Sequence, residues 1–271
     1  MALHRARVPA PAAISDVAPE SVLLLAAGRA VLLQLAHPAV GHGVARHSDF
    51  AADPLKRLHG TLSYIYALTN GTPGQAAAVR EWVDRAHAPV RSEAGADGQH
   101  PAYDARDPEL QLWVAATLYD SALLVHEAVF GPLPPREAEA LYREYAVLGT
   151  ALQMPAGAWP ADRAAFRRYW NDAEARLGVD PAVRRVAGEL LAARNAPFWI
   201  RAAMPVARVL TAGMLPARLR EEFGLPYGPW RDRVFRAVLR TVAATYPRLP
   251  RGLRHAPMHH YLRRLPAGPG A

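Results

Sequence analysis

The chain has 271 residues, of which 51% are apolar, so it is long enough to bury a substantial core as an ordinary globular protein. Its formal net charge is +8, but the arginines are spread along the whole chain and no basic run carries interleaved aromatic residues, which argues against a nucleic-acid partner. The sequence has no cysteine, which excludes disulfides, thiolate zinc sites, iron–sulfur clusters and thiolate-ligated haem.

Residues 1–18 carry no apolar signal core after their arginines, so we expect a flexible or loosely docked arm and a cytoplasmic protein rather than a secreted one. The most apolar stretch, residues 22–36, contains Gly28 and Arg29 and is shorter than the ~20 residues of a membrane-spanning helix. We therefore expect a buried core helix there and no transmembrane segment.

Helix-start signals recur along the chain, whereas alternating strand patterns are nearly absent. The first helix is predicted to run from Pro19 to the His37-Pro38 pair, because the residue before a proline is pushed out of the α region. A short helical piece follows to Val44. An aspartate followed by a proline is typical of a helix cap. Such starts and the apolar periodicity predict further helices over 54–68, 75–91, 108–130, 135–152, 160–176 and 181–195.

Residues 197–214 are apolar on nearly all sides, so we expect them at the centre of the core. Beyond them, short helices alternate with proline breaks, and residues 266–271 have the composition of a frayed tail. No repeat and no long linker divides the chain. The pattern predicts an all-α fold with a single helical domain over residues 19–265.

Three histidines, His37, His42 and His47, follow one another at intervals of five residues. Residues five apart on a helix are rotated by about 140°, so the three side chains cannot share one face of a regular helix. The sequence contains no H-E-x-x-H or E-x-x-H pair, no G-x-S-x-G elbow and no G-x-G-x-x-G loop. Neither a helical metal pair, a serine hydrolase nor a dinucleotide site is indicated.

Arg57 and Thr61 lie four residues apart on one predicted helix and therefore share a face. The turn at 69–74 returns the chain antiparallel, so His87 on the next helix is expected to face the first helix. An apolar gap between helices holds a haem when imidazole binds the iron and hydrogen-bond donors lie over the open position. The competing interpretation is a core histidine and an arginine in a surface ion pair.

Several blocks occur in a characteristic order, beginning with QLAHPAVGHGVARHSDFAADPLKRLHGTLSYIYAL, VDRAHAPVR and YDARDPELQLWVAATLYDS. Two further blocks follow, FGPLPPREAEALYREYAVLG and MPAGAWPADRAAFRRYW. Together they resemble the rubber-oxygenase catalytic domain superfamily over residues 20–180, and more loosely in the C-terminal third. The resemblance implies an all-α protein with a globin-like core that binds haem b and carries out oxygen chemistry.

Position by position, the resemblance implies that His87 is the proximal iron ligand and that Arg57 and Thr61 form the distal pair. The rubber enzyme has a lysine able to ligate iron directly before that threonine, where this chain has Gly60. The resemblance therefore implies a distal site that is open, taken by water or served by another residue. The carboxylate base of the rubber enzyme has no counterpart in the stretch around Gly41. These departures argue against polyisoprene cleavage by the same route, but not against haem.

The histidines near the missing carboxylate are the next candidates. We expect His42 first, and His37 second, to reach the distal pocket, and His47 to pack locally. Asp84, three residues before His87, is a candidate acceptor for the second ring nitrogen of that histidine. A further departure is Ala115, which stands where many relatives carry a histidine.

The sequence thus predicts a haem b-dependent oxygenase or oxidase. Its expected partners are a small or lipophilic secondary metabolite and dioxygen or peroxide, and homo-oligomerisation stays open. One alternative is a haem- or apolar-ligand-binding protein without turnover. Another is a structural helical protein that shares only the fold of the family.

Overall fold

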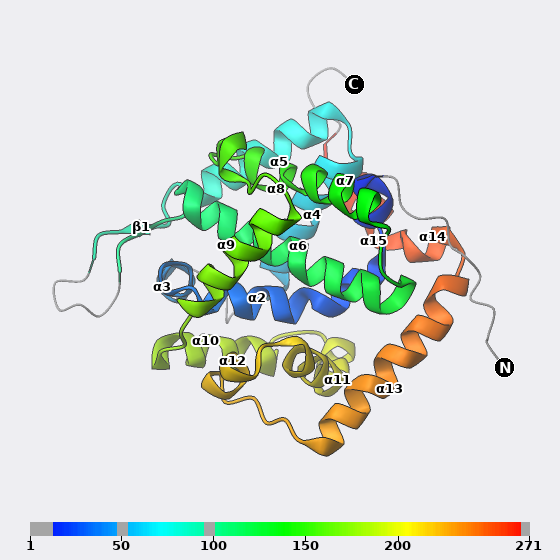
Figure 1. Ribbon diagram of the computed structural model, residues 1–271. Helices are drawn as coiled ribbons and strands as arrows, with labels where there is room; N and C mark the ends of the chain where they lie inside the picture. Colours follow the sequence, from blue (N-terminus) through cyan, green and yellow to red (C-terminus); the bar gives the residue numbers. More distant parts are fainter. Residues whose placement is uncertain (1–12, 48–53, 95–100, 267–271) are drawn as a thin grey trace.

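The structure is a computed structural model that describes residues 13–47, 54–94 and 101–266. These residues form an assembly of helices, and the only sheet among them pairs two short antiparallel strands, β1 (Arg91–Ser92) and β2 (Tyr103–Asp104) (Figure 1). The predicted all-α single-domain fold is therefore confirmed, whereas its globin-like character stays a prediction.

The helices follow one another in three groups. The first contains α1 (Ile14–Val17), the 3₁₀ turn η1 (Ser21–Ala26), α2 (Ala27–Ala36), α3 (Pro38–His47), α4 (Pro54–Asn70) and α5 (Pro73–His87). The second contains α6 (Pro108–Phe130), α7 (Pro135–Tyr145), α8 (Val147–Thr150), η2 (Ala156–Ala158) and α9 (Arg163–Ala175). The third contains α10 (Pro181–Ala192), α11 (Phe198–Met214), α12 (Ala217–Glu222), α13 (Pro229–Thr245), η3 (Tyr246–Arg248), α14 (Arg251–Arg254) and α15 (Ala256–Arg264).

Most predicted helix starts are confirmed, because the local cap chemistry is present. The Asp107 carboxylate accepts from the amide of Glu109 and begins α6, and the Asp180 carboxylate accepts from the amide of Val183 and begins α10. The predicted helix from residue 160 instead begins at Arg163, because the Asp162 side chain caps it. Asp53 lies outside the described residues.

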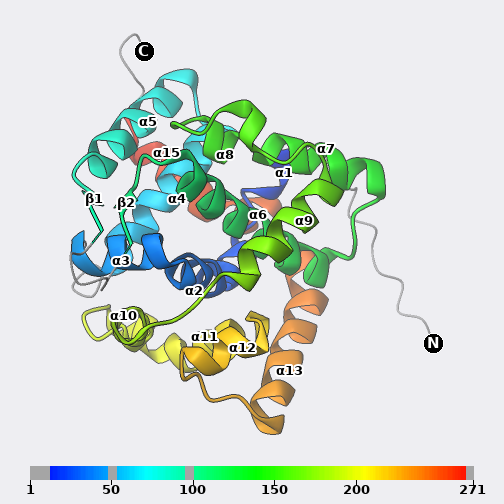
Figure 2. The same ribbon diagram turned by 60° about the vertical axis from the view of Figure 1, so that its left-hand side comes forward.

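The centre of the molecule is the packing of α2 against α6. Figures 1 and 2 show α4, α5, α7 and α8 on one side of α2, and α10 to α13 on the other. The side chains that bury completely at this crossing include Leu32, Leu33, Trp113 and Ala116. The apolar run at 22–36 is thus confirmed as part of the core, although its first six residues form a 3₁₀ turn.

No described helix is by itself long and apolar enough to cross a membrane. Two helical segments, 21–36 and 38–47, pass that test only when taken together, and the chain bends by 101° between them. The bend falls at His37, where the proline that follows ends α2 as predicted.

Two expectations are wrong. Part of the predicted N-terminal arm forms α1, which buries Ile14 and Val17, and the backbone amide of Ile14 donates to the Glu144 carboxylate at 2.6 Å. Residues 1–12 lie outside the described part of the chain. The second error concerns α11, predicted to lie at the centre of the core, because Phe198 is 80% exposed and Trp199 is 66% exposed.

A buried arginine joins three helices, α2, α6 and α11. Arg29 of α2 is 5% exposed, and its Nη2 lies 2.6 Å from Oδ2 of Asp120 on α6. Its Nη1 donates to Oγ of Ser121 at 2.7 Å, and its Nε donates to the carbonyl of Met214 on α11 at 2.9 Å. A buried charge needs such a set of partners to offset its lost hydration.

Replacing this arginine tests the role of the network. We expect Arg29→Ala to lower the free energy of unfolding by about 3 kcal/mol, because it strands a carboxylate, a hydroxyl and a carbonyl. The matched control is Arg85→Ala, which breaks the exposed pair with Glu81 and should cost less than about 0.5 kcal/mol. Urea unfolding followed by circular dichroism measures both, and equal losses would contradict the role given to Arg29.

Candidate active site beside helix α4

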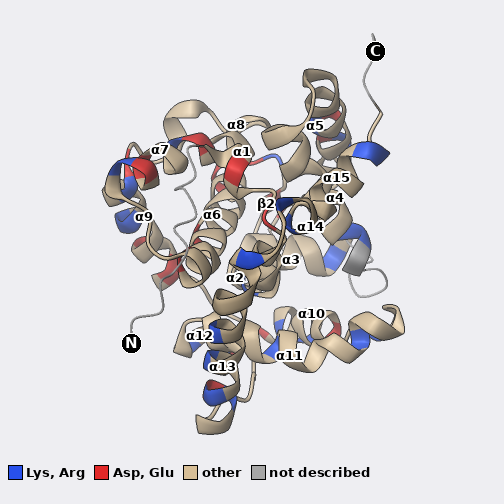
Figure 3. Cartoon of the chain, turned by 90° about the vertical axis from the view of Figure 1, so that its right-hand side faces the viewer, with Lys and Arg blue, Asp and Glu red and all other residues tan. Residues whose placement is uncertain are grey.

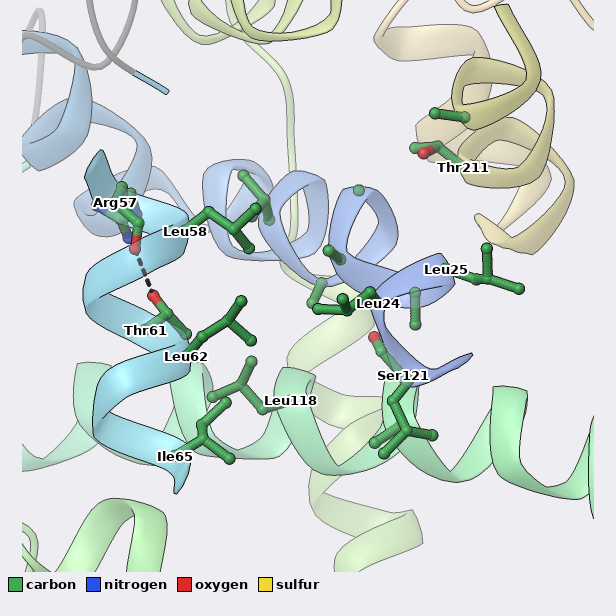
Figure 4. Close-up of a pocket in the computed structure, with 18 of the residues that line it drawn as sticks. Leu24, Leu25, Arg57, Leu58, Thr61, Leu62, Ile65, Leu118, Ser121 and Thr211 are labelled. Carbon is green, nitrogen blue, oxygen red and sulfur yellow. Dashed lines mark hydrogen bonds between the residues drawn. The ribbon is translucent and has the colours of Figure 1, made fainter. Parts of the chain in front are cut away.

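An apolar cavity of about 380 Å³ lies between α4 and the helices α2, α6, α10 and α11 (Figure 4). Leucine, isoleucine, alanine and methionine side chains make up most of its wall. A few side chains with polar groups interrupt this wall, namely Glu20, Gln34, Arg57, Thr61, Tyr66, Ser121, Tyr145 and Thr211. An apolar cleft of ~300–1,000 Å³ with a few polar groups is typical of a small-molecule site.

The predicted pair Arg57 and Thr61 lies in this wall. The Thr61 hydroxyl donates to the carbonyl of Arg57 at 3.0 Å, one helical turn earlier, as Figure 4 shows. Because its single proton is engaged, Thr61 offers a ligand a methyl group and acceptor lone pairs rather than a donor.

Helix α4 has one face toward the cavity and a different face toward α5. Leu58, Leu62 and Ile65 face the cavity. Gly60 faces α5, because a Cβ atom added to it would lie 2.6 Å from the indole ring of Trp82. Trp82 therefore occupies the space that a side chain at position 60 would fill.

His87, the predicted iron ligand, lies at the end of α5, outside the cavity wall. Its Nδ1 atom is buried and has no hydrogen-bond partner among the described residues. Burial lowers the pKa of His87, and the charge of nearby Arg57 lowers it further. The imidazole is therefore neutral at pH 7. Arg57 thus belongs to both environments, since it lines the cavity and acts on His87.

The expected hydrogen bond between Asp84 and His87 is absent from the described contacts. The Asp84 carboxylate accepts instead from Nη2 of Arg106 and from Nε2 of Gln153, each at 2.8 Å. Two strong donors have taken both of its oxygens, so its effect on His87 is only electrostatic.

His42 and His37 do not line the cavity. The Nε2 atom of His42 lies 2.6 Å from Oδ2 of Asp180 and ties α3 to α10. Burial raises the pKa of Asp180, but the Val183 amide and the His42 imidazole outweigh it, so its pKa lies below the ordinary value. The His37 ring lies beside Trp113, with the ring centroids 6.2 Å apart.

The remaining histidine and the missing carboxylate have local explanations. The Nε2 atom of His47 lies 2.9 Å from the Tyr103 hydroxyl, a packing contact between α3 and β2. A Cβ atom on Gly41 would lie 2.3 Å from the carbonyl oxygen of Leu35 and 2.7 Å from the side chain of Val183. Both α2 and α10 approach α3 closely at Gly41, so there is no room for a carboxylate side chain at position 41.

Sequence reasoning missed the other polar groups of the cavity wall. Gln34 donates to the Thr117 hydroxyl at 3.0 Å, and Ser121 accepts from Arg29. Glu20 accepts from the Tyr246 hydroxyl at 2.9 Å. In the sequence, Gln34 could have been noticed as a lone amide in an apolar run. Ser121 and Glu20 give no such signal, because only tertiary packing brings them to the cavity.

Among the described residues, no group of three or more histidines and carboxylates is placed to hold a bare metal ion. Haem iron needs only one or two protein ligands, so this finding bears on ion sites rather than on haem.

The chain matches the family model described as "ER-bound oxygenase mpaB/B'/Rubber oxygenase, catalytic domain" over residues 16–244. The chain belongs to this family. It is also 37% identical over 214 residues to two uncharacterized proteins, one from Mycobacterium bovis and one from Mycobacterium tuberculosis. Each match covers 77% of this chain and 83% of the relative. No solved structure matches the chain. Membership in the family supports an oxygenase, and hence an oxidoreductase.

The neutral state of His87 has a consequence for stability. Folding lowers the pKa of His87, so the unfolded chain binds a proton at this residue more readily than the folded chain does. The neutral His87 therefore contributes to the free energy of unfolding above pH ~6.5, and this contribution is lost as the pH falls below that value. We expect wild type to lose more unfolding free energy than His87→Gln between pH 7.5 and 5.5 in urea titrations. His259→Gln, at an exposed site, is the control and should follow wild type; identical pH profiles of all three proteins would refute the effect.

Proposed function

We propose that the protein is a haem b-dependent oxygenase or oxidase that acts on a small or lipophilic secondary metabolite with dioxygen or peroxide. One observation supports this function above the others. Arg57 lines an apolar cavity of ligand size, and its charge also acts on the imidazole of His87, whose buried Nδ1 atom has no partner among the described residues. The same guanidinium would therefore influence both a redox group held by His87 and a metabolite in the cavity.

The residues around His87 have the chemistry that haem b requires. A neutral imidazole is the usual proximal ligand of haem iron, and the buried Nδ1 atom of His87 has no protein partner among the described residues that would compete for it. Arg57 and Arg106 both act electrostatically on His87, and guanidinium groups suit the carboxylates of the haem propionates. Trp82 is the residue that must yield, and its 45% exposure allows the indole to turn outward without opening the core.

The chain's own residues divide the work of the reaction between them. Bound haem b supplies the electron transfer that activates dioxygen or peroxide. His87 would hold the haem iron through a ring nitrogen, and its imidazole is already neutral at pH 7, so no proton has to leave before it binds. Burial lowers the pKa of Arg57, yet a guanidinium stays protonated, so it stabilises negative charge that develops beside α4.

The cavity wall holds and orients the metabolite. Its leucine and isoleucine side chains exclude water and bind apolar groups. Thr61 orients a ligand hydroxyl or amide through its acceptor lone pairs, since its own proton is bound to the Arg57 carbonyl.

A second candidate function is the binding of an apolar ligand without turnover. The observation that favours it is the cavity wall itself, to which the described residues contribute no imidazole. Oxygen consumption with candidate metabolites separates the two functions, because a carrier consumes none.

A haem titration tests the proposal. We expect the purified apoprotein to bind one equivalent of haem with a Soret band, and His87→Ala to bind at least about tenfold more weakly. Added imidazole should restore the band in His87→Ala if that variant is folded. Trp82→Ala should bind haem at least as tightly as wild type.

The matched control is His47→Ala, which removes a histidine engaged by Tyr103 and should leave the Soret band unchanged. Absence of haem binding by wild type, or equal binding by wild type and His87→Ala, would reject the proposed role of His87.

A further inference from the structure

Helix α11 exposes a continuous apolar stripe. Phe198 is 80% exposed, Trp199 is 66% exposed and Val206 is 45% exposed. Ala202 and Pro205 are also exposed, and the five positions have the i, i+1, i+4, i+7 and i+8 spacing of one helix face. Large apolar side chains at this exposure, grouped on one face, indicate an interaction surface.

The opposite face of α11 forms part of the cavity wall. Ile200, Met204, Ala207 and Thr211 all line the cavity. In Figure 4, Thr211 comes from this helix and faces the cavity across from α4. A single helix therefore separates the apolar cavity from the apolar stripe.

The segment that carries the stripe has charges of one sign only. Residues 190–220 contain no aspartate or glutamate and five arginines, Arg194, Arg201, Arg208, Arg218 and Arg220. Arg201 is exposed, forms no salt bridge within the described residues, and lies seven residues before Arg208, on the same edge of the stripe. Figure 3 shows α11 and α13 together at one end of the molecule, with blue arginine positions on both.

We propose that the stripe Phe198, Trp199, Ala202, Pro205 and Val206 docks on an anionic lipid surface, with Arg201 at the level of the headgroups. A helix with aromatic residues on one face and arginines beside it is typical of a segment that lies in a membrane interface. Anionic lipids attract the arginines, and the apolar stripe is buried at the boundary of the acyl chains. The cavity wall then lies at the lipid surface.

A second copy of the chain fits the stripe less well. A two-fold interface places the same surface on both partners. Two copies of α11 would bring their arginines together with no acidic residue of this helix to offset the repulsion. The lipid surface supplies the opposite charge.

Cosedimentation with vesicles tests the proposal, and it needs neither haem nor turnover, so its outcome is independent of the proposed function. The probes are vesicles of equal parts phosphatidylglycerol and phosphatidylcholine, and vesicles of phosphatidylcholine alone. We expect wild type to bind the anionic vesicles, and less so at high salt. The double variant Phe198→Ser, Trp199→Ser should bind at least about tenfold more weakly than wild type.

Two further variants make the test specific. Arg201→Glu should weaken binding to the anionic vesicles only, and it leaves the apolar stripe intact. The control Leu249→Ser, Leu253→Ser removes side chains that are 44% and 63% exposed at and before α14, and should bind as wild type does.

Binding of the α11 double variant at the wild-type level would overturn the proposal. So would light scattering that shows a wild-type dimer, converted to a monomer by the double variant, together with no vesicle binding by wild type.

Discussion

The rest of the structure depends on the buried guanidinium of Arg29. It joins α2 to the carboxylate and hydroxyl at Asp120 and Ser121 on α6, and to the last carbonyl of α11. These three helices are walls of the cavity. Directly before Arg29, Gly28 lets α11 approach, since a Cβ atom there would clash with Oγ1 of Thr211. The cavity keeps its shape because a charge and a glycine fix the distance between its walls.

Helix α4 presents different chemistry on two of its faces. Its cavity face is apolar, and the face toward α5 carries Gly60 against Trp82. Arg57 is the one cationic side chain that the described residues contribute to the cavity wall. Under the proposed function, haem would lie beside His87 and the metabolite beside the leucines of the cavity wall.

Local chemistry explains what the sequence predicted well. Aspartate caps followed by prolines mark the starts of α6 and α10, and the four-residue spacing of Arg57 and Thr61 correctly places both on one wall. The wrong expectations arise where a side chain binds a partner that is distant in the sequence. Asp84 is drawn to Arg106 and Gln153, and His42 to a carboxylate 138 residues away. Helix α11 is apolar on two opposite faces, one toward the cavity and one toward solvent, and composition alone does not distinguish this from full burial.

The most direct test of the proposed placement of haem beside His87 is the anomalous scattering of iron in crystals of the haem-loaded protein. We expect one iron peak at bonding distance from a ring nitrogen of His87, on the α5 side of α4, with the indole of Trp82 turned away from Gly60. An iron peak inside the cavity between Leu62 and Leu118, with His87 unligated, would contradict this arrangement.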